Sequence, residues 1–170
     1  MRSLSMDSPG QNLLIVVTGA TGQLGADLLE ELKNDFNVIG VGSSDFDITN
    51  LLQTEEFITE FQPDIIIHSA AYTDVDGCEK NKDKAFMVNG LGSRNVAIAA
   101  RNVGARLVYI STDYVFDGEK DDLYREYDKT NPQSIYGKSK LLGEQFVREQ
   151  IPEHYICRIA WLYGQHGGNF

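Results

Sequence analysis

Short apolar runs alternate with longer amphipathic stretches along most of the chain. Residues 13–17 form a continuous apolar run, which is typical of a buried parallel strand. The next stretch carries Leu24, Leu28 and Leu32 at helical spacing. The same alternation predicts strands over 13–17, 37–41, 64–68, 106–111 and 154–160, and helices over 23–33, 49–61, 83–103 and 134–150, of which 83–103 contains two glycines.

Five strands alternating with four helices predict an α/β fold, a Rossmann-type doubly wound parallel sheet. We assign 13–170 to this domain. Residues 1–12 are polar and lack periodicity, so we expect a disordered leader there. The polar stretch 117–133 is longer than an ordinary connection, and we expect it to be a functional loop.

A glycine-rich segment joins the first predicted strand directly to the first predicted helix. It reads Thr-Gly-Ala-Thr-Gly-Gln-Leu-Gly over 18–25. Gly19 permits a tight turn, Gly22 lets the backbone approach a diphosphate, and Gly25 lets the helix pack closely on the strand. The N–H groups at the start of that helix then face the phosphates. This context predicts a dinucleotide site.

Net charge and cysteine content narrow the choice of partners. The formal net charge is −10 and no Lys/Arg-rich run occurs, which argues against nucleic-acid or anionic-membrane binding. Cys78 and Cys157 match neither a disulfide framework nor a metal pattern, so we expect two reduced thiols and no metal site. No segment is apolar enough to span a membrane, we expect no signal peptide, and we predict a cytoplasmic protein.

The glycine spacing, preceded by Thr, resembles that of the short-chain dehydrogenase/reductase superfamily. That resemblance predicts a Tyr-x-x-x-Lys motif, and Tyr136 and Lys140 supply it at the start of a predicted helix. The spacing places both side chains on one helical face. We expect the Lys140 ammonium to lower the pKa of Tyr136, so that its phenol can protonate a carbonyl oxygen as hydride reaches the carbon.

Two hydroxyl residues end the fourth predicted strand, Ser111 and Thr112. Ligands of such sheets bind at the carboxyl ends of the strands, so these hydroxyls should face the site. The superfamily resemblance gives Thr112 the role of hydrogen-bonding the substrate carbonyl, with Ser111 as the alternative.

Longer motifs narrow the resemblance. Segments 111–118 (STDYVFDG), 132–144 (PQSIYGKSKLLGE) and 158–164 (RIAWLYG) are similar to the dTDP-4-dehydrorhamnose reductase family, as are 47–49 and 70–76. The resemblance implies NADPH- or NADH-dependent reduction of the 4-keto group of dTDP-4-dehydro-L-rhamnose to dTDP-L-rhamnose.

The resemblance also implies roles for individual residues. The catalytic set would be Thr112, Tyr136 and Lys140. The cofactor would be lined by Gly19, Gly22, Gln23, Leu24, Gly25, Asp47, Ile48, Ala70, Ala71 and Tyr72, with Lys140 also reaching the nicotinamide ribose. The nucleotide sugar would contact Val75, Tyr114 and Trp161. For Trp161 plain core packing stays an alternative, and Asn89 either orients the site or fixes nearby backbone.

Two departures from the family pattern leave alternatives open. No acid ends the second strand to bind a ribose 2′-OH and no Arg stands there for a 2′-phosphate, because Asp45 comes late, so the choice between NADH and NADPH stays open. The family continues well past Phe170 into a substrate-binding region, so we expect a domain that is truncated before that region. We also expect it to self-associate, with a homodimer as one option. The alternative functions are another nucleotide-sugar epimerase, dehydratase or reductase, or a non-catalytic NADP-binding regulatory subunit resembling that of methionine adenosyltransferase.

Overall fold

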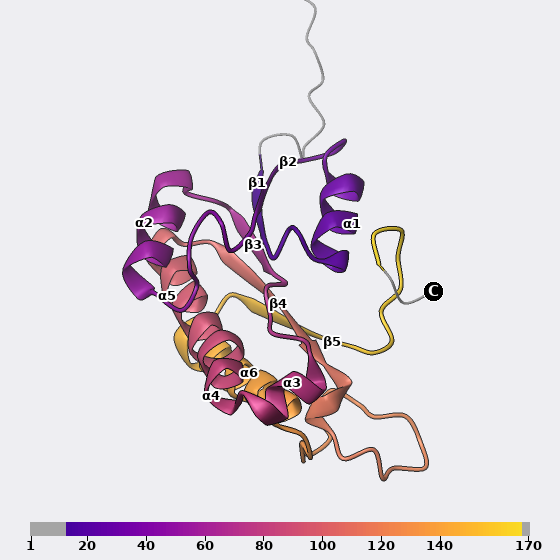
Figure 1. Ribbon diagram of the computed structural model, residues 1–170. Coiled ribbons are helices and arrows are strands. Elements are labelled where there is room, and N and C mark those ends of the chain that lie inside the picture. The colour runs from indigo at the N-terminus through magenta and orange to yellow at the C-terminus, as the bar shows by residue number, and fades with distance from the viewer. Residues whose placement is uncertain (1–12, 168–170) are drawn as a thin grey trace, which may run out of the picture.

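A five-stranded parallel sheet forms the centre of the molecule (Figure 1). The computed structural model describes residues 13–167, so the leader predicted over 1–12 lies outside the described residues. The strand order is β2-β1-β3-β4-β5 and every pairing is parallel. The strands are β1 (Leu14–Thr18), β2 (Asn37–Val41), β3 (Ile65–His68), β4 (Arg106–Thr112) and β5 (His154–Ile159). The predicted parallel, doubly wound architecture is confirmed.

Helices lie on both faces of this sheet (Figure 1). They are α1 (Gln23–Leu32), α2 (Leu51–Phe61), α3 (Val75–Lys80), α4 (Lys82–Ala85), a π-helix η1 (Phe86–Gly92), α5 (Ser93–Val103), a 3₁₀ turn η2 (Asp113–Val115) and α6 (Ile135–Gln150). Helix α1 packs on β1 and β2 from one face, whereas α2, α5 and α6 cover the other. Among residues 13–167, no helix is both long and apolar enough to cross a membrane.

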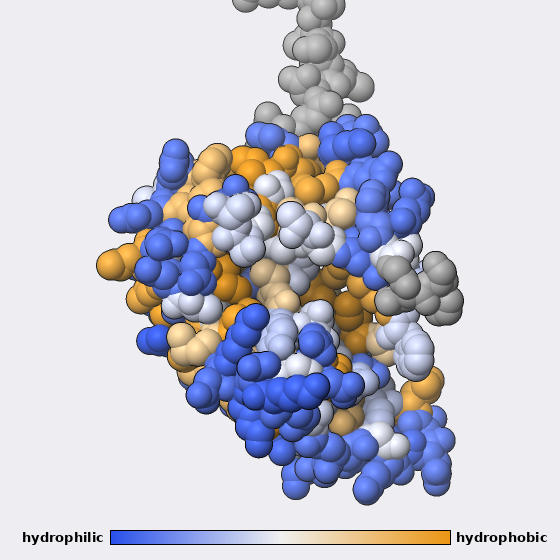
Figure 2. Space-filling view, in the orientation of Figure 1, coloured by the Kyte–Doolittle hydropathy of each residue, from blue (hydrophilic) through white to orange (hydrophobic). Residues whose placement is uncertain are grey.

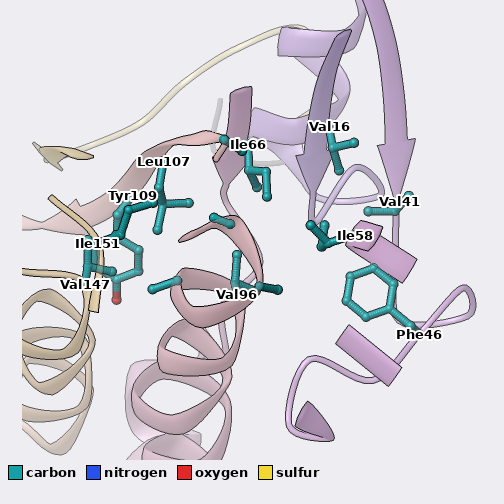
Figure 3. Close-up of a cluster of buried hydrophobic side chains, with 14 residues drawn as sticks. Val16, Val41, Phe46, Ile58, Ile66, Val96, Leu107, Tyr109, Val147 and Ile151 are labelled. Carbon is teal, nitrogen blue, oxygen red and sulfur yellow. The ribbon is translucent and has the colours of Figure 1, made fainter. Parts of the chain in front are cut away.

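The hydrophobic core lies between the sheet and the layer of α2, α5 and α6 (Figure 3). Val16, Ile66 and Leu107 point into it from three neighbouring strands, and Val96 and Val147 meet them from α5 and α6. All five side chains are fully buried. Burying apolar side chains of this size contributes roughly 1.5–3 kcal/mol each, so this layer holds the strands that carry the site.

The segment predicted as one helix over 83–103 is helical without a break, through α4, the π-helix η1 and α5, so a helix along this segment is confirmed and only the wider π turn inside it was not predicted. The two glycines in it are contact points. A Cβ on Gly90 would lie 2.8 Å from Leu142 of α6, and one on Gly92 would lie 2.9 Å from Ile48. The wider π turn places these glycines where other elements approach closely, and π turns of this kind are frequent at functional sites.

The carboxyl ends of the strands gather the residues of the predicted site at one edge. Thr18 pairs with His68 across β1 and β3, and Thr112 pairs with Ile159 across β4 and β5. The chain order reverses between β1 and β3, which is the point where doubly wound sheets bind ligands. Residues 116–134 contain no helix or strand, as predicted for a loop, and the Asn131 N–H donates to the Val115 carbonyl at 2.9 Å to close it.

Candidate active site

A cleft of about 1050 Å³ opens over this edge of the sheet. Figure 2 shows this face hollowed at its centre, with hydrophobic side chains inside the hollow. Residues from the glycine-rich loop and from the ends of all five strands line the cleft. Its volume is at the upper end of the range for small-molecule sites and accommodates an extended ligand.

The glycine loop has the geometry that the sequence predicts. Gly19 has φ +73°, and a Cβ there would lie 2.6 Å from the Ala70 backbone nitrogen. A Cβ on Gly25 would overlap the Gly19 carbonyl. Gly22 is the N-cap of α1 and provides no side-chain cap, so the first N–H groups of the helix remain available to an anion at the cleft.

Most of the predicted cofactor residues line the cleft. They are Gly19, Gly22, Gln23, Leu24, Gly25, Asp47, Ile48, Ala70 and Ala71. Tyr72 is not among the lining residues, and its ring lies instead under Lys84, with 4.6 Å between the ammonium and the ring centroid. Its neighbour Thr73 lines the cleft, as does Ser69, and sequence reasoning missed both.

The three predicted catalytic side chains meet at the cleft. Thr112 ends β4, while Tyr136 and Lys140 lie on the first two turns of α6. Ser134 caps this helix by accepting a hydrogen bond from the Gly137 N–H at 3.0 Å, which fixes the turn that carries Tyr136. The structure therefore brings together the constellation that the motifs predict.

The hydroxyls of Ser111 and Thr112 have different hydrogen-bond partners. The Ser111 hydroxyl donates to a Glu144 carboxylate oxygen at 2.7 Å, and Ser111 is buried. The Thr112 hydroxyl donates to Asp113 at 3.0 Å and is also a hydrogen-bond partner of the Tyr136 side chain. Of the two hydroxyls that the sequence left open, Thr112 is the one associated with Tyr136.

The expectation that Lys140 lowers the pKa of Tyr136 is wrong for this structure. Burial raises the pKa of the Tyr136 phenol, and the hydrogen bond with Thr112 opposes that rise only in part. Lys140 is not among the groups that shift this pKa; its ammonium donates to the Ile110 carbonyl at 2.7 Å and lies 4.2 Å from the centroid of the Tyr109 ring. Burial in turn lowers the pKa of Lys140 to about 7.

The three predicted substrate residues also line the cleft, at its outer part. Tyr114 is half-exposed and meets Tyr136 edge-on, with 5.6 Å between ring centroids. Val75 begins α3. Trp161 is 88% exposed and has φ +49°, so it does not pack in the core of residues 13–167. An exposed indole beside a cleft is suited to contact a ligand.

A buried chain of polar groups behind the cleft was not predicted. His68 Nδ1 lies 2.7 Å from the Thr18 hydroxyl, and its Nε2 lies 3.1 Å from the Ser93 hydroxyl. The Ser93 hydroxyl donates to the Asn89 carbonyl at 2.8 Å, so we assign the proton to Nε2 of a neutral imidazole. Burial, followed by the charge of Lys140, lowers the pKa of His68 to about 3.

Asn89 continues this chain toward α6, the helix that carries Tyr136. Its side-chain amide accepts from the Tyr72 N–H at 2.7 Å and donates to the Tyr72 carbonyl at 3.0 Å. It also donates at 2.9 Å to the Ser139 hydroxyl, which donates to the Tyr136 carbonyl at 2.8 Å. Of the two roles that the sequence left open, Asn89 fixes backbone on both sides of the cleft.

Asp45 is the acidic residue that follows the end of β2, four residues beyond Val41. Asp45 folds back, and its carboxylate accepts from the Gly42 N–H at 2.7 Å. Gly42 and Ser43 line the cleft, whereas Asp45 does not. The structure thus uses Asp45 as a turn cap, and no basic side chain lines the cleft at this strand end within residues 13–167.

Comparisons with known proteins identify the family of the chain. The family model described as the RmlD substrate binding domain matches residues 13–170. The chain is 43% identical over 157 residues to the spore coat polysaccharide biosynthesis protein SpsK of Bacillus subtilis, covering 92% of this chain and 56% of that protein.

Two solved structures are similar in fold and sequence. A dTDP-4-dehydrorhamnose reductase from Clostridium acetobutylicum shares 49% identity with a TM-score of 0.90, over 93% of this chain and 56% of that one. The Bacillus anthracis dTDP-4-dehydrorhamnose reductase in complex with NADP shares 48% identity with a TM-score of 0.90, over 93% and 57%. The chain therefore spans about half the length of these relatives, and the resemblance inferred from the motifs is confirmed.

Proposed function

The chain belongs to the RmlD substrate binding domain family, and on this premise we propose that it carries the cofactor site and the proton donor of a dTDP-4-dehydrorhamnose reductase. The reaction is the NAD(P)H-dependent reduction of the 4-keto group of dTDP-4-dehydro-L-rhamnose to dTDP-L-rhamnose. The observation that carries the proposal is the meeting of Thr112, Tyr136 and Lys140 at the cleft that the glycine loop lines.

The residues of the cleft fit a dinucleotide. Side chains at Gly19 or Gly25 would collide with backbone, so glycine at these positions permits the tight turn and the close approach of α1 to the loop that place the start of α1 at the cleft. The uncapped N-terminus of α1 offers N–H groups and a partial positive charge to a diphosphate. Ala70, Ala71 and Ile48 supply small or apolar contacts along the remaining wall. When bound, the reduced nicotinamide supplies hydride to the carbonyl carbon.

Tyr136 acts as the proton donor. Burial keeps its phenol protonated at neutral pH, because the pKa is raised above its ordinary value of about 10. As charge develops on the carbonyl oxygen, the phenol gives its proton to that oxygen and becomes a phenolate. The hydroxyl of Thr112 turns its single proton from Asp113 to the same carbonyl oxygen and so holds that oxygen beside Tyr136.

The substrate contacts Val75, Tyr114 and Trp161, and Lys140 contacts the nicotinamide ribose. Support comes from their positions, since all four line one cleft. A cleft without a basic side chain at the end of β2 suits either NADH or NADPH. We also propose that the protein is cytoplasmic and forms a homodimer.

The experiment that tests the proposal supplies the protein carrying this chain with NADPH and the dTDP-linked 4-keto sugar. We expect oxidation of the reduced cofactor to depend on the sugar, and dTDP-L-rhamnose to appear in equal amount. A protein that binds NADPH yet leaves the sugar unreduced would favour the non-catalytic regulatory subunit. Interconversion of nucleotide sugars without net oxidation of NADPH would favour an epimerase.

A further inference from the structure

Glu144 is a fully buried carboxylate that the chemistry described so far does not use. It lies on α6 one turn beyond Lys140 and two turns beyond Tyr136, on the same face of the helix. Burial raises the pKa of this carboxyl, but hydrogen bonds from Arg158 and Ser111 outweigh burial and lower the pKa. Glu144 is therefore an ionised group placed behind the catalytic pair.

Four hydrogen bonds satisfy both oxygens of this carboxylate. Arg158 of β5 donates through Nε at 2.8 Å and through Nη2 at 2.7 Å, in the bidentate geometry that suits guanidinium and carboxylate. The Ser111 hydroxyl of β4 donates at 2.7 Å and Arg148 donates at 3.0 Å. A buried charge held this completely fixes the position of every element that contributes a donor.

The donors include the residue next to Thr112. Ser111 and Arg158 are direct neighbours in the register of β4 and β5. Glu144 joins both of them to α6, so the carboxylate sets the end of β4 against the helix that carries Tyr136. Because Thr112 follows Ser111 directly, the same contact fixes where the Thr112 hydroxyl lies relative to Tyr136.

Glu144 also balances the charge of Lys140. The buried ammonium is faced by His68 from β3, by the Tyr109 ring from β4 and by Glu144 from its own helix. The imidazole of His68 is neutral and the Tyr109 phenol stays protonated because burial raises its pKa. Of these groups, only Glu144 brings a negative charge that opposes the loss of the Lys140 proton.

We propose that Glu144 is a positioning residue for the reduction, which holds Thr112 opposite Tyr136 through Ser111 and favours the protonated form of Lys140. This inference rests on the proposed function for the part that concerns Thr112. The part that concerns Lys140 rests on the placement of two buried side chains one turn apart on α6, so the two parts are tested by different measurements.

The main test replaces Glu144→Gln, which keeps the shape of the side chain and removes its charge. Glu149→Gln is the matched control, since Glu149 is exposed on the same helix. NMR of protein with isotope-labelled lysine follows the titration of Lys140, assigned through loss of its signal in Lys140→Arg. We expect the Lys140 midpoint to fall by at least about one pH unit in Glu144→Gln and to stay unchanged in the control.

Turnover tests the second part. We expect Glu144→Gln to lower kcat by at least about tenfold, as small displacements of a catalytic group do. NADPH affinity at pH above the Lys140 midpoint should stay the same. Ser111→Ala cuts the link to β4 and leaves the Arg158 pair intact, so it should lower kcat without moving the Lys140 midpoint.

Each outcome bears on the proposal. An unchanged Lys140 midpoint in folded Glu144→Gln would overturn the charge-balancing role, and unchanged kcat in Ser111→Ala would overturn the positioning role. If Glu144→Gln does not fold, the double variant Glu144→Gln with Arg158→Met removes both buried charges together, and its Lys140 midpoint decides the first role. Absence of sugar reduction by the unaltered protein would refute the proposed function, while the Lys140 titration would still decide the charge-balancing role.

Discussion

Protonation of His68 should make the stability of this protein fall steeply in mild acid. The imidazole is completely buried between the Thr18 and Ser93 hydroxyls, and its pKa is lowered to about 3. In the unfolded chain the same group titrates near 6.5. Between these values only the unfolded state binds the proton, so the unfolded state gains stability as the pH falls.

The magnitude follows from the difference between the two pKa values. Each pH unit in this window shifts the folding equilibrium by roughly 1.4 kcal/mol, so lowering the pH from about 6.5 to about 4.5 costs about 2 kcal/mol. Lys140 and Asp117 act outside this window. Lys140 has a pKa of about 7 in the folded protein, so its effect on the free energy of unfolding is confined to pH values above about 7, where it increases that free energy. Asp117 has a pKa of about 2, and its contribution to the free energy of unfolding is lost only below about pH 4.

The assay is urea unfolding at several pH values in this window, with the unaltered protein, His68→Asn and the control His166→Asn. His166 is more than 40% exposed at its side chain and reports the effect of losing a histidine at the surface. We expect His68→Asn to be less stable at pH 7 by about 1–3 kcal/mol, because a buried partner loses its hydrogen bond, but to lose little more on acidification. Equal pH slopes in all three proteins would refute a neutral buried His68.

Three further predictions concern the cleft. Tyr136→Phe should lower turnover by at least about 100-fold with NADPH affinity unchanged, as measured by steady-state kinetics and fluorescence titration; retained turnover would remove Tyr136 from the role of acid. Gly25→Ala should abolish dinucleotide binding, because the added methyl group overlaps the Gly19 carbonyl, and a titration with unchanged affinity would contradict the proposed loop geometry. NADH and NADPH should bind within about tenfold of each other, and a hundredfold preference would mean that another residue reads the 2′ position.

The strands, the glycine loop and the cluster of Thr112, Tyr136 and Lys140 at the cleft were predictable because each leaves a local signal. Apolar runs of strand length, a glycine motif between strand and helix, and a spacing of four between Tyr136 and Lys140 are all visible in the sequence. Helix α3 was not, since its six residues are too short to show a helical period. The π-helix η1 escaped because the glycines within it weaken the pattern without indicating a wider turn.

The electrostatics of the site could not be read from the sequence. The spacing of Tyr136 and Lys140 correctly indicates one helical face, but the direction of the Lys140 ammonium depends on Ile110 and Tyr109, thirty residues earlier. Glu144 did leave a signal, a carboxylate at the next spacing of four along the same helix. Its partner Arg158 belongs to another strand, and only the folded sheet brings the two together.

The strand order also has a consequence for biosynthesis on the ribosome. After β1 and β2 have paired, β3 adds to the free side of β1, β4 adds to β3 and β5 adds to β4. Residues emerge from the ribosome at roughly 5–20 per second, so the pairing partner of each new strand is synthesised before that strand. No strand has to insert between two that are already paired, and a nascent chain at any length presents one growing edge for the next strand.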